Sequence, residues 1–232
     1  SVPVNDPKGM ASLNNRLFIG SRNTNTVVVF NEVTQTTIKS ITVGPKPWGV
    51  AAVNNKIYVA NNGNVSISVI DPVLLTKTKD IKLNGICDGG PANVAGDTNN
   101  NRVFVAMYGN RVAVIDANSD TLSDCIPTAG GTFGIAYNST LNQLYVTNRD
   151  DLSVQVFDVS TNPATLVQTE KLGGVPYSVE ANLSTNEVYV SVAFNPPDYD
   201  NANNLEVFTA DLSGISLSLA TITGNTHDGG YM

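Results

Sequence analysis

The chain has 232 residues, of which 41% are hydrophobic and 14% charged, and its formal net charge is −7. The hydrophobic share supports a buried core, while the low charged share leaves Asn, Ser, Thr and Gly to fill the polar positions, as expected for many short strands and turns. The negative charge argues against nucleic acid or an anionic membrane surface as partner, because both are recognised by basic patches. No apolar run approaches the ~20 residues of a membrane-spanning helix, so we expect no membrane insertion.

Three series of residues recur along the chain in corresponding positions, at intervals of roughly 40 to 46 residues, except for a last interval of about 51 in the third series. The first series is a small residue after a Gly/Pro turn: Gly9, Gly49, Asn93, Gly134 and Ser178. The second is the central aromatic residue of an apolar strand: Phe18, Tyr58, Phe104, Tyr145 and Tyr189. The third is a valine in an alternating strand: Val29, Val69, Val114, Val156 and Val207. Apolar residues alternate with a period of two in these segments, which favours strands over helical repeats.

A period of this length with four short strands per unit is typical of propeller blades. We therefore predict an all-β protein, a β-propeller of four-stranded blades, as a single domain over residues 1–232. Five complete blades are expected at about residues 5–44, 45–88, 89–130, 131–174 and 175–224, and residues 225–232 begin a sixth unit. The chain is then a piece of a larger, for example seven-bladed, propeller, or it closes with five blades, or another copy completes it. The exposed strand edge of an unfinished ring favours the first alternative.

Two sets of small or acidic residues have structural explanations. The small residues of the first series are expected where the innermost strands crowd together and a larger side chain would clash. Asp71, Asp116 and Asp158, with Asn31 in the same register, follow the third strand of each unit. An acidic or amide side chain there can accept backbone N–H groups and fix the turn.

The cysteines and the glycosylation motifs leave alternatives open. Cys87 and Cys125 are either two buried thiols or one disulfide formed in an oxidising compartment. Asn-X-Ser/Thr acceptors occur at Asn64, Asn138 and Asn182, in predicted turns that would permit modification. About as many such triplets are expected by chance in a chain this rich in Asn, Ser and Thr, so they do not decide the compartment.

Signals for catalysis are few. His227 is the only histidine, which excludes a multi-histidine metal site. No nucleophile turn or phosphate-binding loop is present, and the Gly-Gly pairs fall at blade crossings. The fifth blade carries a long insertion in which Asp198 and Asp200, among asparagines, could supply oxygen ligands to Ca²⁺. No other cofactor is expected, and an enzyme is the less favoured alternative.

The predicted geometry places one residue of each blade at the mouth of the central channel, directly before the small residue. These residues are Lys8, Trp48, Ala92, Phe133 and Tyr177, with Asp228 in the partial unit. The turns after the second strand add Arg22, Asn61, Asn62, Tyr108, Asn148 and Arg149. Aromatic faces with amides and guanidinium groups suit a polar ligand such as a sugar, or a peptide. The alternative is that these aromatics only plug the channel mouth.

Tyr145-Val146-Thr147-Asn148 and the variant Tyr58-Val59-Ala60-Asn61 resemble the repeat motif of the YVTN family of β-propellers. The resemblance covers the chain from about Pro7 onward, although the strands at Phe104 and Tyr189 lack the final Asn. It implies a surface-layer, secreted or periplasmic propeller, commonly with seven blades, while members differ in role.

We accordingly expect a secreted or cell-surface, non-enzymatic binding or assembly module with a glycan or protein ligand at the channel mouth. One alternative is a structural subunit of a surface layer or filament, formed as a homo-oligomer by strand addition. Another is a propeller lactonase or lyase, as some similar seven-bladed propellers are.

Overall fold

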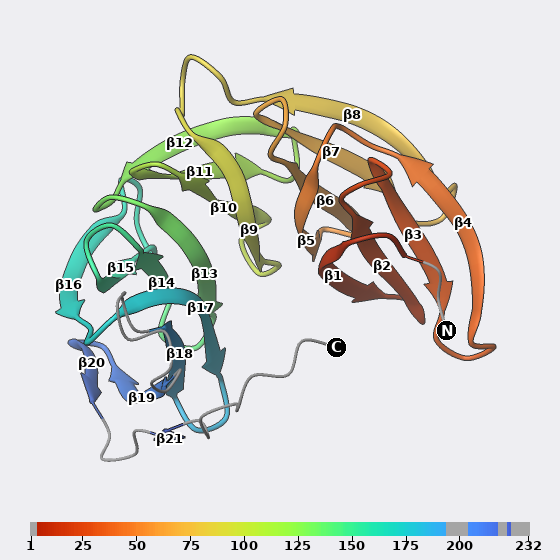
Figure 1. The fold of residues 1–232 in the computed structure, drawn as a ribbon. Helices are drawn as coiled ribbons and strands as arrows, with labels where there is room; N and C mark the ends of the chain where they lie inside the picture. Colours follow the sequence, from red (N-terminus) through yellow and green to blue (C-terminus); the bar gives the residue numbers. More distant parts are fainter. Residues whose placement is uncertain (1–3, 194–203, 218–221, 224–232) are drawn as a thin grey trace. The chain divides into compact units, whose positions relative to one another are not determined.

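A computed structural model of the chain describes residues 4–193, 204–217 and 222–223. These residues form strands joined by turns, and no helix occurs in the ranges just given (Figure 1). The structure therefore confirms the all-β prediction. No helix long and apolar enough to cross a membrane is found within the same ranges. The chain divides into two compact units, Ser1–Pro127 and Thr128–Met232.

The first unit contains three four-stranded antiparallel sheets, each with its strands in sequence order. The first sheet comprises β1 (Pro7–Leu13), β2 (Arg16–Ser21), β3 (Thr26–Asn31) and β4 (Thr36–Thr42). The second comprises β5 (Pro47–Val53), β6 (Lys56–Asn61), β7 (Ser66–Asp71) and β8 (Thr76–Lys82). The third comprises β9 (Gly90–Asp97), β10 (Arg102–Tyr108), β11 (Arg111–Asp116) and β12 (Thr121–Pro127). The first strands β1, β5 and β9 lie next to one another (Figure 1).

The second unit contains two further sheets of the same order. The fourth sheet comprises β13 (Thr132–Asn138), β14 (Gln143–Asn148), β15 (Ser153–Asp158) and β16 (Thr165–Lys171). The fifth comprises β17 (Val175–Asn182), β18 (Glu187–Ala193), β19 (Asn204–Asp211) and β20 (Gly214–Leu217), and β21 (Ile222–Thr223) also pairs with β19. Here β13 and β17 are the neighbouring first strands.

The turns follow the sequence rules closely. Asn14-Asn15 and Asn54-Asn55 have positive φ values between 48° and 58°, which two-residue hairpin turns require and which Asn tolerates. Asn31 and Asp71 each accept backbone N–H groups from the residues two and three positions ahead, at 2.8–2.9 Å. Asp116 and Asp158 each accept one such bond at 2.8 Å. The predicted structural role of these four residues is confirmed.

The core lies between successive sheets of a unit. Phe18, Val27 and Val29 of the first sheet pack against Ile57, Val59 and Ile70 of the second. The same arrangement joins the second sheet to the third and, in the second unit, the fourth sheet to the fifth. Phe18, Tyr58 and Tyr145 are completely buried at these interfaces, so burial of an aromatic side chain of ~150–250 Å² stabilises each one.

The small residues of the first strands are required by close backbone approach. A Cβ added to Gly49 would lie 2.6 Å from the Ala92 carbonyl oxygen, and one added to Gly9 would lie 2.7 Å from that of Trp48. In the second unit, a Cβ on Gly134 would lie 2.6 Å from the Tyr177 carbonyl oxygen. Each glycine thus faces the equivalent strand of the next sheet. The expected crowding is present at all three positions.

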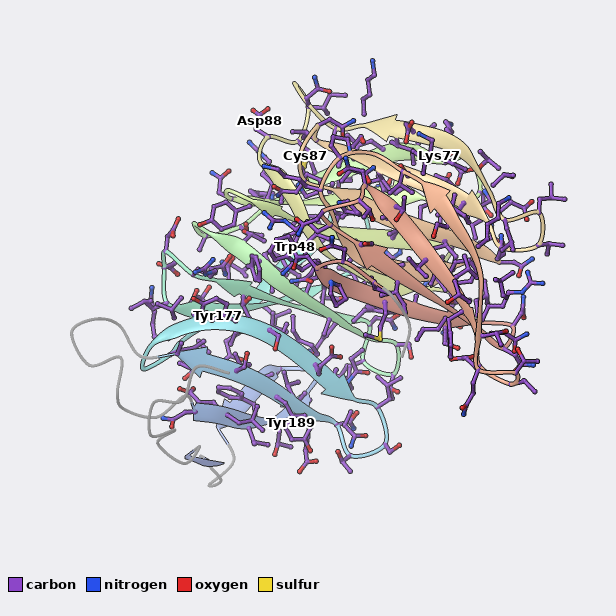
Figure 2. The ribbon with its side chains drawn as sticks, turned by 45° about the vertical axis from the view of Figure 1, so that its right-hand side comes forward. Trp48, Lys77, Cys87, Asp88, Tyr177 and Tyr189 are labelled. Carbon is purple, nitrogen blue, oxygen red and sulfur yellow. A yellow bond between two sulfur atoms is a disulfide. The ribbon has the colours of Figure 1, made fainter. Side chains whose placement is uncertain are left out.

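A disulfide joins Cys87 and Cys125, with their Cα atoms 5.8 Å apart. Cys87 is buried in the crossing from β8 to β9 (Figure 2), and Cys125 belongs to the outermost strand of the third sheet. Of the two alternatives for the cysteines, the structure thus contains the bridge. It ties the crossing to the sheet that follows it and is compatible with an extracellular location.

In the first, second and fourth sheets, a polar contact at the start of the second strand joins the sheet to the one that follows it. The residue two positions before the central aromatic donates to a backbone carbonyl in the third-to-fourth-strand turn of the following sheet. Arg16 donates to Pro72, Lys56 to Ala117 at 3.0 Å, and Gln143 to Asp211 at 2.7 Å. We call this position the latch residue.

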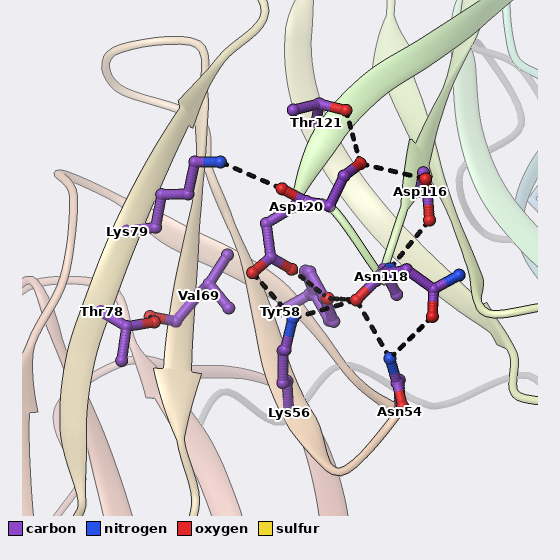
Figure 3. A network of polar contacts seen from close by, with 12 residues as sticks. Asn54, Lys56, Tyr58, Val69, Thr78, Lys79, Asp116, Asn118, Asp120 and Thr121 are labelled. Carbon is purple, nitrogen blue, oxygen red and sulfur yellow. Dashed lines mark hydrogen bonds and ion pairs between the residues drawn. The ribbon is translucent and has the colours of Figure 1, made fainter.

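The second latch is the most elaborate (Figure 3). Lys56 also pairs with Asp120 at 2.7 Å, and the Tyr58 hydroxyl donates to the same carboxylate at 2.6 Å. Burial, followed by the hydrogen bond to Asp120, raises the pKa of Tyr58 far above its ordinary value. Burial likewise raises the pKa of Tyr145 to about 12. These phenols therefore remain neutral donors inside the interfaces throughout the physiological range.

Candidate ligand-binding face

The first strand of every sheet is irregular at the same place. Its pairing with the second strand skips two residues, for example between Pro7 and Met10 and between Pro47 and Val50. The skipped residues are the predicted channel-mouth residue and its small neighbour: Lys8-Gly9, Trp48-Gly49, Ala92-Asn93, Phe133-Gly134 and Tyr177-Ser178. A bulge of this kind redirects a side chain out of the regular pleat. We call the first residue of each pair the bulge residue.

In the first unit, the Trp48 ring lies beneath two cations. The Lys8 Nζ atom is 5.0 Å and the Arg22 Cζ atom 5.3 Å from the ring centroid. Asp6 holds both cations in place, with an oxygen 2.8 Å from Lys8 and 3.3 Å from Arg22. The hydrogen bond from Lys8, with a further one from Arg22, holds the pKa of Asp6 below its ordinary value against the opposing effect of desolvation. Four side chains from two sheets thus form one polar-aromatic cluster.

In the second unit, Arg149 takes the position that Arg22 has in the first. Its Cζ atom lies 4.4 Å from the Tyr177 ring centroid and 5.3 Å from that of Phe133. Its Nη2 atom also donates to the Tyr177 hydroxyl at 3.1 Å. The two rings meet edge to face with centroids 6.2 Å apart. Tyr177 remains 41% exposed, so this cluster is accessible from solvent.

The same backbone turn positions the arginines in both units. The Arg22 amide donates to the Asp6 carbonyl at 3.1 Å, and the Arg149 amide donates to the Gly131 carbonyl at 3.0 Å. The accepting residue has a positive φ in each case, 53° at Asp6 and 74° at Gly131. An arginine after the second strand is thereby placed over the bulge residue of the next sheet, and the stacking geometry is repeated.

The remaining residues predicted to contact a ligand differ in their exposure to solvent. Asn62 is partly exposed and donates to the Pro91 carbonyl at 3.3 Å, while Tyr108 is 48% exposed. Ala92 is buried and presents no side chain to a ligand. Asp228, Asp198, Asp200 and His227 lie outside the described residues. Within those residues no cluster of three or more His, Cys, Asp or Glu side chains could hold a metal ion.

Asn61 and Asn148 were placed wrongly by the sequence analysis. They are the last residues of β6 and β14, and both are completely buried. The Asn61 amide donates to Ser66 and Ser68 at 3.1 and 2.9 Å, and the Asn148 amide donates to Gln155 at 3.2 Å. Their side chains join two strands of one sheet and cannot contact a ligand at the surface. We therefore remove them from the candidate face.

The glycosylation acceptors also differ from one another. Asn64 is exposed, and Asn182 is partly exposed. Asn138 is completely buried, and its side-chain oxygen accepts the amides of Thr140 and Leu141. The prediction that all three turns permit modification is therefore wrong for Asn138, because its side-chain nitrogen is enclosed.

Sequence reasoning missed Asp6, which organises the first cluster. It also missed the pairing of an arginine with an aromatic residue in the next repeat. The separation between Arg22 and Trp48 is close to that between Arg149 and Tyr177, and this recurrent spacing could have revealed the pairs.

No profile of a known protein family matches the chain, and neither does any curated protein. Solved structures do match. A chain of Kuenenia stuttgartiensis hydrazine synthase has a TM-score of 0.81 at 17% identity, covering 94% of this chain and 67% of that one. A chain of the mitotic checkpoint complex has a TM-score of 0.76 at 16% identity, covering 96% and 66%. A functionally unknown protein from Desulfotomaculum acetoxidans DSM 771 has a TM-score of 0.75 at 16% identity, covering 93% and 69%.

This chain therefore spans about two-thirds of the length of each of these three chains. At such low identity the likeness concerns the fold alone. Together with the five antiparallel sheets, it supports a β-propeller architecture.

Proposed function

We propose that this chain is a non-enzymatic binding module that takes a glycan or protein ligand at the clusters around its bulge residues, one in each unit. The observation that carries the proposal is the cluster of Phe133, Arg149 and Tyr177, in which a bulge presents an exposed aromatic residue beneath a guanidinium group. Tyr, Trp and Arg are the side chains that contribute most to recognition, because they combine large contact areas with directed polar groups. A rigid sheet scaffold lets them bind with little rearrangement.

The clusters favour a ligand with hydrogen-bond acceptors over one that only stacks. Cations cover one face of Trp48 and of Tyr177, so that face is closed to a sugar ring. A guanidinium group stacked on an aromatic ring directs its N–H groups outward in its own plane, where carbonyl, hydroxyl or carboxylate oxygens can accept them. We expect the ligand to present such oxygens.

We further propose that the chain is a YVTN-type propeller, part of a ring of more than five blades, and secreted or displayed at the cell surface. Each polar residue of the Tyr145–Asn148 motif has a role that a repeat would preserve. Tyr145 is buried between sheets and donates to Gln143 at 2.8 Å, and Thr147 accepts the Gly134 amide at 2.7 Å. The disulfide supports the proposed location, since such bridges persist in oxidising compartments.

An array of neutral glycans, uronate-containing glycans and peptides tests the binding proposal. We expect Tyr177→Ala and Arg149→Ala to weaken binding of the captured ligand by at least about tenfold, which corresponds to about 1.4 kcal/mol. Trp48→Ala tests the first cluster in the same way. Val33→Ala is the matched control, because Val33 is 72% exposed in a turn away from the bulge residues. Unchanged binding by all three cluster variants would place the ligand elsewhere.

A further inference from the structure

The first sheet has one face that is less covered than its equivalents. Met10 is the first residue to pair regularly after the bulge of β1, and it is 57% exposed. The equivalent residues after the other bulges are Val50, Val94, Ile135 and Val179. Val94 is partly buried, and the other three are 7%, 7% and 2% exposed. Leu17 is partly exposed, whereas its equivalents Ile57, Leu144 and Val188 are fully buried. Phe30 is partly exposed, whereas its equivalents Ile70 and Phe208 are 0% and 1% exposed.

The equivalents show what normally covers such a face. In the second sheet, Ile57 and Ile70 belong to a cluster with Phe18, Val27 and Val29 of the sheet before it. In the fifth, Val188 and Phe208 belong to a cluster with Tyr145, Val154 and Val156 of the fourth. In both cases the covering surface is the central aromatic of a second strand with two branched residues of a third strand.

We infer that the face of the first sheet carrying Met10, Leu17 and Phe30 is a docking surface for a further four-stranded sheet of the same repeat. Large apolar side chains exposed together mark an interaction site more often than a free surface. This inference rests on the proposed ring of more than five blades and is independent of ligand binding at the bulge residues.

The latch restricts which sheet can dock. The three described latches place a donor, Arg16, Lys56 or Gln143, against a carbonyl of the following sheet. Two of these carbonyls belong to the residue directly after the turn-fixing aspartate, Pro72 and Ala117. The equivalent residue in the first sheet is Glu32, directly after Asn31, and its carboxylate adds a negative charge there. The docking sheet therefore carries Lys, Arg or Gln at its latch position.

The fifth sheet of a second copy does not meet this requirement. Its latch residue is Glu187, whose carboxylate accepts the hydroxyls of Tyr189 and Thr185 at 2.7 Å. A glutamate directed at the Glu32 carbonyl would oppose two acceptors and two negative charges, which is unfavourable. We therefore assign the docking surface to a sheet with a donor latch, outside residues 1–232.

Grafting a sheet of known latch chemistry onto the full chain tests this assignment. Residues 45–83, fused directly ahead of Val4, present Tyr58, Ile67 and Val69 with the donor Lys56. The connection to Pro7 then has the length of residues 43–46, which join the first and second sheets. We expect amide hydrogen exchange at Leu17 to Ile19 and Val28 to Phe30 to slow at least tenfold and the unfolding temperature to rise.

Two matched grafts separate packing from latching. A graft with Ile67→Asp and Val69→Asp should give no protection, and one with Lys56→Glu should give several-fold less than the unaltered graft. Absence of protection by the unaltered graft would overturn the docking surface. Equal protection by the Lys56→Glu graft would overturn the donor requirement.

Sedimentation of the ungrafted chain tests the competing occupant. We expect no concentration-dependent dimer at micromolar concentration. A dimer abolished by Met10→Glu but not by Val33→Glu would assign the face to a second copy and overturn the inference. None of these readouts involves the ligand array, so failure of one proposal is distinguishable from failure of the other.

Discussion

The two arginine–aromatic clusters occupy equivalent backbone positions but differ in how their cations are held. In the first unit, Arg22 and Lys8 are both paired with Asp6 above the Trp48 ring. In the second, Arg149 lies over two aromatic rings and donates to the Tyr177 hydroxyl. The repeat thus fixes where a side chain points, while the individual residues decide its electrostatics. Asp6 offsets one of the two positive charges of the first cluster and accepts hydrogen bonds from both of its cations. Arg149 has aromatic partners instead, which leaves more of its N–H groups for acceptor groups of a ligand.

The largest expected effect is on stability, and it distinguishes the two units because the disulfide lies within the first one. Replacing both Cys87 and Cys125 by Ala should lower the unfolding free energy of the first unit by about 4 kcal/mol, because the bridge closes a long loop of the unfolded chain. Hydrogen exchange resolved by segment measures this. Exchange in β14 and β15 of the second unit serves as the internal control, and equal acceleration there would mean that the two units unfold together.

A smaller effect tests whether both units depend on the same crowding. Gly49→Ala should lower the free energy of unfolding, measured in urea, by about 1–3 kcal/mol. The reason is that the added Cβ would lie 2.6 Å from the Ala92 carbonyl oxygen. Gly134→Ala should cost a similar amount in the second unit. Gly109→Ala is the control, since a Cβ there lies no closer than 3.5 Å to another atom. Equal stability of the Gly49 and Gly109 variants would contradict the close approach of first strands.

The smallest effect examines the acidic holder itself. The pKa of Asp6 is lowered, so its carboxylate stays charged and paired with Lys8 and Arg22 as pH falls through the usual carboxyl range. The pairs are lost only when pH falls through the lowered pKa. Trp48 is the only tryptophan, so its fluorescence should change in that acidic window and, at neutral pH, in Asp6→Asn. Asp151→Asn, which breaks the comparable pair with Lys171 in the second unit, should leave the emission unchanged. Little change in stability is expected, because exposed ion pairs contribute little.

Periodic features of the sequence predicted the repeated part of the structure. The aromatic strands, the glycines at close approach and the Asx turns each recur in register, so one physical explanation covered every copy. The bulges were not predicted, because the first skipped residue differs in every sheet and the recurring small residue after it was explained by crowding alone. The burial of Asn61 and Asn148 was missed because a terminal Asn was interpreted as a turn residue. The hydroxyls of Ser66, Ser68 and Ser153 opposite them were the available signal of a buried polar network.

The bulges have a consequence for how the binding surface can evolve. Each bulge residue stands outside the regular pairing of its strands, so its identity is constrained little by the ladder beside it. Lysine, tryptophan, alanine, phenylalanine and tyrosine already occupy this position on nearly identical backbones. New specificities can therefore be sampled one substitution at a time, without endangering the framework that presents them.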